Sequence, residues 1–380
     1  MLIMKTPKSV DIDITNRCNL RCKHCYYYTS TAETAYELGT EEWLKFFEEL
    51  NRCAVMSINI AGGEPFIRED FRDIINGIVL NRMRFSILSN GTLITPDYAS
   101  FLKNTKRCDY VQVSIDGSGD HTHKLLRGEG NFFKAVEGIQ NLQNHGVPVS
   151  VRVTIFRGNV DDLEKIATYL LEDLGLPSFS TNDASYMGLC RSHTEDIQLS
   201  TENRTKAIAV ILSLQQKYPG RITAQAGPLA EADRFAKIES ARLLGETSLP
   251  GGGYLTACGC IFNKIAVRAD GTIVPCTMLS QIELGRINLD DLTEIWQTHP
   301  TMEAMRKRNR IPLSNFSWCE GCEYINFCTG NCPALAFTSF GVIDHPSPSG
   351  CIKRFLANGG SFSKTQTDHL LTAINNHTNH

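Results

Sequence analysis

Long apolar runs, an excess of positive charge and an export signal are all missing from this 380-residue sequence. No apolar stretch approaches the roughly 18 residues of a membrane-spanning helix. The opening segment MLIMKTPK is too short to be a secretory signal. The formal net charge is −3, which disfavours a nucleic-acid partner because such proteins carry a basic surface. We therefore expect a cytoplasmic protein that binds neither a membrane nor a nucleic acid.

Cysteine, by contrast, is abundant, since the chain contains 14. In a protein without an export signal, metal binding accounts for so many cysteines better than disulfides do. The hydrophobic content of 42% supports a globular fold, and the length fits one large domain and a smaller one.

Three of the cysteines, Cys18, Cys22 and Cys25, form a compact CxxxCxxC loop in the stretch NRCNLRCKHC. A four-iron cluster takes four ligands, so three thiolates leave one iron open to a ligand that is not protein. The alternative is a zinc knuckle that borrows a fourth ligand such as His24, but structural zinc sites pair their cysteines as CxxC units in a closed tetrahedron. The number of ligands favours the cluster.

Short β-rich runs alternate with helical segments over the first half of the chain. The expected strands are residues 10–15, 57–61, 85–89, 110–115, 149–155 and 179–182. The expected helices begin near Thr40, Asp70, Thr95, Asn131 and Asn159. This alternation predicts a parallel sheet with helices packed outside it. Six units are fewer than the eight of a closed barrel, so the expected fold class is α/β, as a partial (βα)6 TIM-like barrel.

Polar and glycine-containing motifs follow the expected strands. They are the cysteine loop, GGEP at 62–65, SNG at 89–91 and SIDG at 114–117. In parallel α/β folds, sites form at the carboxyl ends of the strands. Glycine lets the backbone approach a ligand closely, and Glu64 could then accept a hydrogen bond from a substrate ammonium group. The alternative is that these residues only make turns and caps.

The cysteine loop after a first strand, together with AGGEP after a second, resembles the radical S-adenosylmethionine (radical SAM) enzymes. The resemblance implies that the amino and carboxylate groups of the methionine part of SAM chelate the open iron, and that one electron then yields a 5′-deoxyadenosyl radical that takes hydrogen from unactivated carbon. A guanidinium group can pair with the SAM carboxylate through two hydrogen bonds, so Arg127 and Arg152 are both candidates for that contact. The residues expected to contact SAM are Gly62, Gly63, Glu64, Asn90, Ser114, Asp116, Arg127 and Arg152.

A second group of cysteines fills the last third of the chain. Their spacing is Cx10Gx4C, a gap, Cx2Cx5Cx3C, another gap, and C. The stretch IAVRADGTIVPC alternates around Asp270-Gly271 and predicts a hairpin that brings Cys260 and Cys276 close. A zinc ribbon is the alternative for the CxxC pair, although eight thiolates in this order suit two clusters better.

This pattern resembles the SPASM domain, an extension with two auxiliary [4Fe-4S] clusters in many radical enzymes that modify peptides. The resemblance implies three [4Fe-4S] clusters in all, one of which binds SAM. The nearer auxiliary cluster would take Cys276, Cys332 and a ligand from the Cys258 and Cys260 pair. Both cysteines of that pair would complete it, whereas only one would leave an iron open. The farther cluster would take Cys319, Cys322, Cys328 and Cys351.

Differences from two neighbouring families reduce the number of families that the chain could resemble. Anaerobic sulfatase maturases carry an acidic residue directly after the second hairpin cysteine, where this chain has Thr277, and the enzyme of pyrroloquinoline quinone assembly has an aspartate ligand where this chain has cysteine. The chain resembles, nearly end to end, the SynChlorMet cassette radical SAM/SPASM family (ScmE). The stretches that carry this resemblance are TNDASYMGLC (181–190) and GCEYINFCTGNCPALA (321–336).

The resemblance implies an oxidoreductase that crosslinks or oxidises a ribosomally made precursor peptide. Cys18 lies too near the amino terminus for a leading peptide-binding domain, so a separate PqqD-like leader-binding protein is expected, with an electron donor such as flavodoxin or ferredoxin. The alternatives are a radical SAM dehydrogenase of small molecules and a zinc-stabilised scaffold. The expected domains are a barrel core (1–185), a helical bridge (186–255), an auxiliary-cluster domain (256–356) and a poorly ordered polar tail (357–380).

Overall fold

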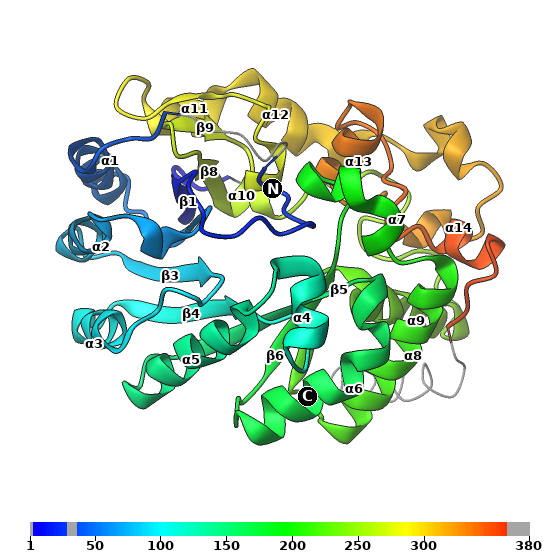
Figure 1. The fold of residues 1–380 in the computed structure, drawn as a ribbon. Helices are drawn as coiled ribbons and strands as arrows, with labels where there is room; N and C mark the ends of the chain where they lie inside the picture. Colours follow the sequence, from blue (N-terminus) through cyan, green and yellow to red (C-terminus); the bar gives the residue numbers. More distant parts are fainter. Residues whose placement is uncertain (1–2, 29–35, 363–380) are drawn as a thin grey trace. The chain divides into compact units, whose positions relative to one another are not determined.

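The computed structural model describes residues 3–28 and 36–362, and its chain forms two compact units. The first unit comprises Met1–Ile115, His123–Val151 and Cys258–Arg306, and the second comprises Asp116–Thr122, Arg152–Ala257 and Lys307–His380. Within the described residues, no helix has the length and apolarity that a membrane crossing requires. The chain is α/β, with the strand and helix alternation that the sequence predicts (Figure 1).

Parallel strands form the framework of the first unit. The strands are β1 (Ser9–Thr15), β2 (Ser57–Gly62), β3 (Arg84–Ser89), β4 (Cys108–Ser114), β8 (Lys264–Val267), β9 (Thr272–Val274) and β10 (Gly285–Arg286). Their order is β10-β9-β8-β1-β2-β3-β4. Strands β1 to β4 and β8 run parallel, and β9 is antiparallel to both β8 and β10. The register pairs Ser9 of β1 with Ser57 of β2 and with Lys264 of β8.

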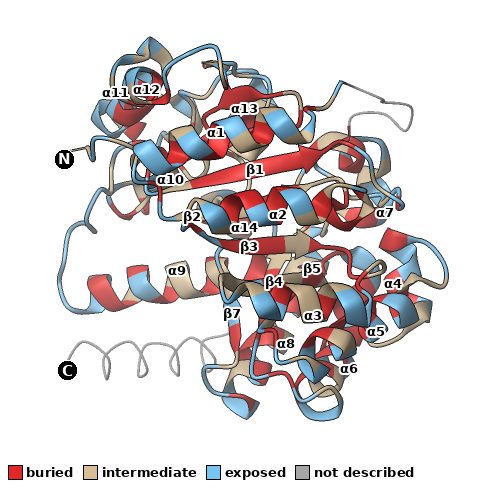
Figure 2. Ribbon diagram, turned by 90° about the vertical axis from the view of Figure 1, so that its left-hand side faces the viewer, coloured by how far each residue is buried: buried red, intermediate tan, exposed pale blue. Residues whose placement is uncertain are grey.

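Amphipathic helices cover this sheet. They are α1 (Thr40–Arg52), α2 (Phe71–Leu80), α3 (Pro96–Thr105), α5 (Asn131–Asn144), α10 (Cys260–Asn263) and α11 (Leu292–Thr298), while α4 (Asp120–Arg127) and α12 (Pro300–Lys307) cross the boundaries of the unit. Helix α1 buries Trp43, Phe46, Phe47 and Leu50, whose spacing of three to four residues places them on one face. Figure 2 shows α1, α2 and α3 lying across β1, β2 and β3, with β1 buried along its length. The sheet thus has an apolar face under the helices.

The second unit contains the end of β5 (Val149–Ile155), together with β6 (Phe179–Asp183) and β7 (Ile222–Ala224). Its α-helices are α6 (Leu163–Thr168), α7 (Thr194–Ile197), α8 (Thr201–Lys217), α9 (Gly227–Leu243), α13 (Pro333–Phe340) and α14 (Ile352–Ala357). Short helical turns connect many of them, and residues 169–173 form a π-helix after α6. The Ser200 hydroxyl caps α8 by accepting a hydrogen bond from the Asn203 amide at 3.1 Å.

Two predicted details differ from the structure. The bridge at 186–255 was expected to be helical, but it also contains β7, which pairs in parallel with β6 and is too short at three residues to show alternation. Near Asn159 the chain forms a 3-10 turn (Arg157–Asp162) before α6 begins, because the Asn159 side chain accepts a hydrogen bond from the Phe156 amide at 2.8 Å. Residues 258–306 pack in the first unit through the pairing of β8 with β1, and the boundaries of the auxiliary-cluster domain stay a prediction. Most of the tail predicted at 357–380 lies outside the described residues.

Candidate active site

The first candidate site is the cysteine loop that follows β1. The Leu20 amide donates a hydrogen bond to the Cys18 sulfur at 3.4 Å, and the Cys25 amide donates to the Cys22 carbonyl at 3.0 Å, which closes a turn. All three cysteines are outside disulfides and partly buried. Burial raises the pKa of Cys18 to about 11, and the nearby charges of Glu64 and Cys25 act in the same direction. The three thiols therefore lie together, and a metal that binds them must displace their protons.

The loop after β2 rests directly on the cysteine loop. The Gly63 amide donates to the Thr15 carbonyl and the Glu64 amide donates to the Arg17 carbonyl, both at 2.9 Å. A Cβ atom on Gly62 would lie 2.2 Å from the Thr15 oxygen, and one on Gly63 would lie 2.1 Å from the Arg17 oxygen. Gly62 also has a φ of +119°, which disfavours any other residue. The glycines thus allow one loop to pack on the other, and their contact with SAM stays a prediction.

Glu64 is fully buried between the ends of β2 and β3. Its carboxylate accepts hydrogen bonds from the Ser89 hydroxyl and the Asn90 amide, both at 2.8 Å, and from the Phe66 amide at 3.3 Å. Burial raises the pKa of Glu64 to about 7, although these hydrogen bonds oppose the rise. A carboxylate offers about four acceptor positions, so three bonds leave room for a further donor such as an ammonium group.

Two side chains from distant positions reach the sulfurs of the cysteine loop. The Asn90 amide group lies 3.8 Å from the Cys18 sulfur and donates to the Asn19 side chain at 2.9 Å. The Arg127 guanidinium lies 3.8 Å from the Cys22 sulfur. Hydrogen bonds and positive charge near the sulfurs raise the reduction potential of an iron–sulfur cluster. Neither contact could be predicted from the sequence, because 72 and 105 residues separate the partners.

The remaining residues expected to contact SAM lie in different places. Ser114 ends β4 in the first unit, whereas Asp116 and Arg152 belong to the second. Asp116 is fully buried, and its carboxylate accepts a hydrogen bond from the Thr154 amide at 2.7 Å. The Asn159 side chain donates to the Asp116 carbonyl at 3.0 Å. Asp116 thus fastens its loop to β5, and the SAM contacts of all three residues stay predictions.

The hairpin cysteines lie around one lysine in the first unit. Strands β8 and β9 pair through Val267 and Ile273, as the sequence predicts, and the reversal has Gly271 at a φ of +87°. Lys264 donates to Asp11 at 2.6 Å, and the charges of Asp11, Cys260 and Cys276 raise the pKa of the lysine against its burial. A hydrogen bond with Cys258, together with burial, raises the pKa of Cys260. The hairpin therefore brings three of the predicted ligands together.

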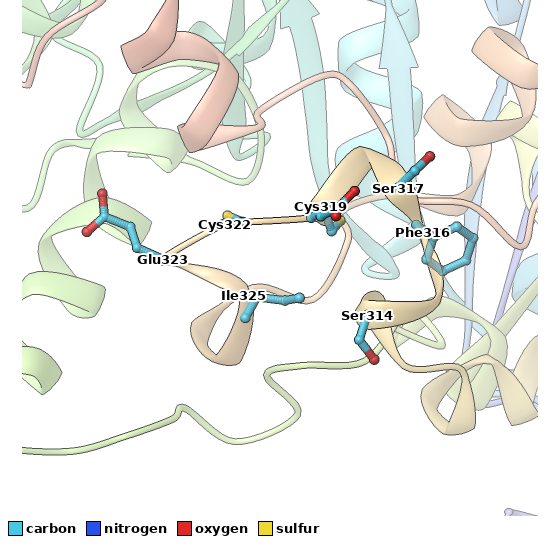
Figure 3. A pocket seen from close by; sticks show the side chains of 9 residues that line it. Ser314, Phe316, Ser317, Cys319, Cys322, Glu323 and Ile325 are labelled. Atoms are coloured by element: carbon cyan, nitrogen blue, oxygen red, sulfur yellow. The ribbon is translucent and has the colours of Figure 1, made fainter.

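Four further cysteines gather in the second unit, and Figure 3 shows two of them, Cys319 and Cys322. Burial raises the pKa of Cys319 to about 11, and the charges of Cys328, Cys322 and Cys351 add to the effect. The Gly330 amide donates to the Cys328 sulfur at 3.4 Å, and the Cys322 amide donates to the Cys319 carbonyl at 3.1 Å. This is the set of four that the sequence predicts for one cluster. A pocket of about 670 Å³ lies beside Cys319 and Cys322.

The donor sets suit iron–sulfur clusters. Within residues 3–28 and 36–362, no group of three or more His, Cys, Asp or Glu side chains is arranged to hold a single metal ion. The cysteine loop offers three thiols with amide and guanidinium groups beside the sulfurs, and the second unit offers four. Thiolate ligands with N–H donors at sulfur are typical of such clusters. Cys332, the N-cap of α13, lies in the second unit and stays a predicted ligand.

Two family models match the chain. The model of the radical SAM superfamily matches residues 12–170, and that of the SPASM iron-sulfur cluster-binding domain matches residues 258–323. The first range contains the cysteine loop, and the second contains the hairpin cysteines, Cys319 and Cys322.

Several known proteins are similar over most of their length. Mycofactocin maturase MftC from Mycobacterium tuberculosis is 34% identical over 371 residues, which cover 96% of this chain and 89% of that protein. Fe-coproporphyrin III synthase from Methanosarcina barkeri is 27% identical over 89% of this chain and 86% of that protein. The structure of native anSMEcpe with bound AdoMet has a TM-score of 0.72 at 19% identity, covers 97% of this chain and 99% of that chain, and shares its fold. The chain is therefore an enzyme of the radical SAM/SPASM maturase family, with S-adenosylmethionine and [4Fe-4S] clusters as cofactors.

Proposed function

We propose that this enzyme modifies a ribosomally made precursor peptide in the cytoplasm, using SAM and three [4Fe-4S] clusters. When bound, SAM and its cluster supply a carbon-centred radical that abstracts hydrogen from the substrate. The observation that carries the proposal is the gathering of three cysteines outside any disulfide, Cys18, Cys22 and Cys25, on the loop that Gly63 and Glu64 contact. Three protein ligands leave the fourth position of a cluster to SAM.

The residues of this chain bind and orient the cofactors. Glu64 has room for the ammonium group of SAM beside its three hydrogen bonds. Ser114 and Asp116 would contact the ribose and carboxylate, and Arg127 or Arg152 the carboxylate. The contact of Arg127 with the Cys22 sulfur favours a role at the cluster, and both arginines stay candidates for the SAM carboxylate. The auxiliary clusters would be held by the ligand sets Cys258, Cys260, Cys276 and Cys332, and Cys319, Cys322, Cys328 and Cys351.

The peptide substrate is supported by the maturase at 34% identity. The finer assignment to the SynChlorMet cassette family, the PqqD-like leader-binding protein and the flavodoxin or ferredoxin donor belong to the same proposal. The proposal also includes the division of the chain into a core (1–185), a bridge (186–255), an auxiliary-cluster domain (256–356) and a tail. We expect either a crosslink or an oxidation of the peptide.

The experiment is anaerobic reconstitution followed by metal analysis and turnover. Three clusters require about twelve irons per chain with matching sulfide, whereas a scaffold would hold two or three zinc ions without sulfide. Incubation with SAM, dithionite and each short peptide encoded beside the gene should release 5′-deoxyadenosine. Mass spectrometry should show a peptide that has lost hydrogen. Failure to form 5′-deoxyadenosine with iron-replete enzyme would contradict the proposal.

A small-molecule substrate is the second candidate, because Fe-coproporphyrin III synthase is 27% identical over 89% of this chain. Auxiliary clusters can accept electrons from a substrate of any size, so the cysteine ligand sets do not distinguish a peptide substrate from a small-molecule substrate. Release of 5′-deoxyadenosine that depends on a porphyrin and on none of the peptides would favour this alternative.

A further inference from the structure

Strand β1 presents two chemically different faces in the first unit. Val10, Ile12 and Ile14 are fully buried and apolar. Asp11 and Asp13 alternate with them and point to the opposite face, because successive side chains of a strand point to opposite sides. Both carboxylates are buried, with 9% and 3% of their surface exposed. Each therefore needs a compensating partner.

Asp11 has its partners within the sheet. It accepts hydrogen bonds from Lys264 of β8 and from the Asn59 side chain of β2, both at 2.6 Å. The Ser86 hydroxyl of β3 donates to Asn59 at 2.6 Å, so one chain of polar contacts spans four strands. The charge of Asp11 is thus balanced by the protein itself.

Asp13 lacks such a partner. Its Oδ1 atom is buried, and no described residue donates a hydrogen bond to it. Its neighbour across β2 is Ala61, which has no polar side chain. The nearby Arg268 is held elsewhere, by Asp270 at 3.0 Å, the Ser280 carbonyl at 3.2 Å and Glu283 at 3.4 Å. Among the described residues, Oδ1 of Asp13 therefore has no donor of the kind that Lys264 and Asn59 provide for Asp11.

The position of Asp13 suits a ligand. It lies near the carboxyl end of β1, which is where parallel α/β folds bind their substrates, and five residues before Cys18. The titratable and charged groups that face it are Asp11, Arg268 and the two tyrosines that follow Cys25, Tyr26 and Tyr27. None of them donates a hydrogen bond to Oδ1.

We propose that Asp13 accepts the proton that the substrate peptide loses as its carbon radical is oxidised, an inference that rests on the proposed function. The C–H bond breaks first, and its hydrogen atom passes to the SAM-derived radical. An O–H, N–H or S–H bond of the peptide then breaks as that atom bonds to the radical carbon. Its proton passes to the Asp13 carboxylate, and one electron passes to an auxiliary iron–sulfur cluster.

The charge state of Asp13 agrees with this role. Burial, with the charge of Asp11 adding to it, raises the pKa of Asp13 to about 7. A base is most effective when its pKa lies near the working pH. Since the base must be deprotonated, product formation in the wild type should rise with pH through about 7.

The test compares Asp13→Asn with Asp11→Asn in reconstituted enzyme. Asn keeps the volume of Asp13 and removes its capacity to take a proton. The substrate is the peptide that the wild-type enzyme modifies in the experiment of the preceding subsection. With this peptide, Asp13→Asn should slow product formation by about 100-fold or more. Hydrogen transfer from deuterated peptide to 5′-deoxyadenosine should persist. Asp11→Asn removes a charge from the same face but leaves Asp13 in place, so the rise of product formation with pH should remain.

A measurement without peptide keeps the inference testable if the proposed function fails. Infrared difference spectra of the wild type between pH 5 and 9 should show a buried carboxyl group that titrates near neutral pH and is absent in Asp13→Asn. Titration of Asp13 near its ordinary pKa of about 4 would overturn the proposal. So would an Asp13→Asn enzyme that forms product at the wild-type rate with an unchanged pH profile.

Discussion

The cysteine loop of the first unit and the four-cysteine set of the second are built differently. The loop has three thiols, and two of its sulfurs contact side chains that are distant in the sequence, Asn90 and Arg127. The second set has four thiols, and the Cys328 sulfur is contacted by the amide of Gly330 from its own loop. Four protein ligands complete a cluster, whereas three leave one iron to react. In the proposed function, the loop carries out the chemistry and the second set transfers electrons.

Loss of one cysteine from the loop should have the largest effect on activity, because the loop is the set proposed to bind SAM. Cys25→Ala leaves two thiols in the loop, too few to hold a cluster. We expect release of 5′-deoxyadenosine to fall by more than the roughly 10–100-fold that loss of an outer-shell partner causes. Chromatographic assay of 5′-deoxyadenosine checks this. Release at the wild-type rate would assign the chemistry to another site.

Loss of a cysteine from the second set should separate the two functions. In Cys328→Ala we expect about four irons fewer per chain and little modified peptide. Cleavage of SAM in the absence of peptide should continue, because the loop is intact. Iron analysis with parallel assays of 5′-deoxyadenosine and peptide mass gives the answer. A variant that loses both activities together would show that the two regions are not independent.

The fold and the grouping of the loop cysteines could be predicted from the sequence, because strand alternation and the CxxxCxxC spacing are local. The hairpin at Gly271 was also predictable from Asp270-Gly271. The pairing of β8 with β1 was not, since it joins residues more than 250 positions apart. For the same reason, the contact of Arg127 with Cys22 and the missing partner of Asp13 could be seen only in the structure.

A substitution at Gly63, where the two loops pack together, should have an effect of intermediate size. Gly63→Ala places a Cβ atom 2.1 Å from the Arg17 carbonyl oxygen, so one loop must move. We expect the free energy of unfolding to fall by about 1–3 kcal/mol, measured by urea denaturation under anaerobic conditions. Gly259→Ala is the matched control, because a Cβ atom there has no neighbour within 4 Å. Equal stability of the two variants would argue against close packing of the loops.

The smallest expected effect concerns the cation at Cys22. Arg127→Gln removes a positive charge 3.8 Å from the sulfur, so the reduced cluster loses stabilisation. The reduction potential of the loop cluster should fall by on the order of tens of millivolts. A potentiometric titration followed by electron paramagnetic resonance measures this. Arg127→Lys retains the charge and should stay closer to the wild type.

The most direct test of the account is whether SAM binds to the cluster of the cysteine loop. Electron paramagnetic resonance spectra of the reduced, reconstituted enzyme should change on addition of SAM, and the change should be absent in Cys25→Ala and present in Cys328→Ala. A spectrum of the reduced wild-type enzyme that SAM leaves unchanged would contradict the open coordination position on which the proposed function depends.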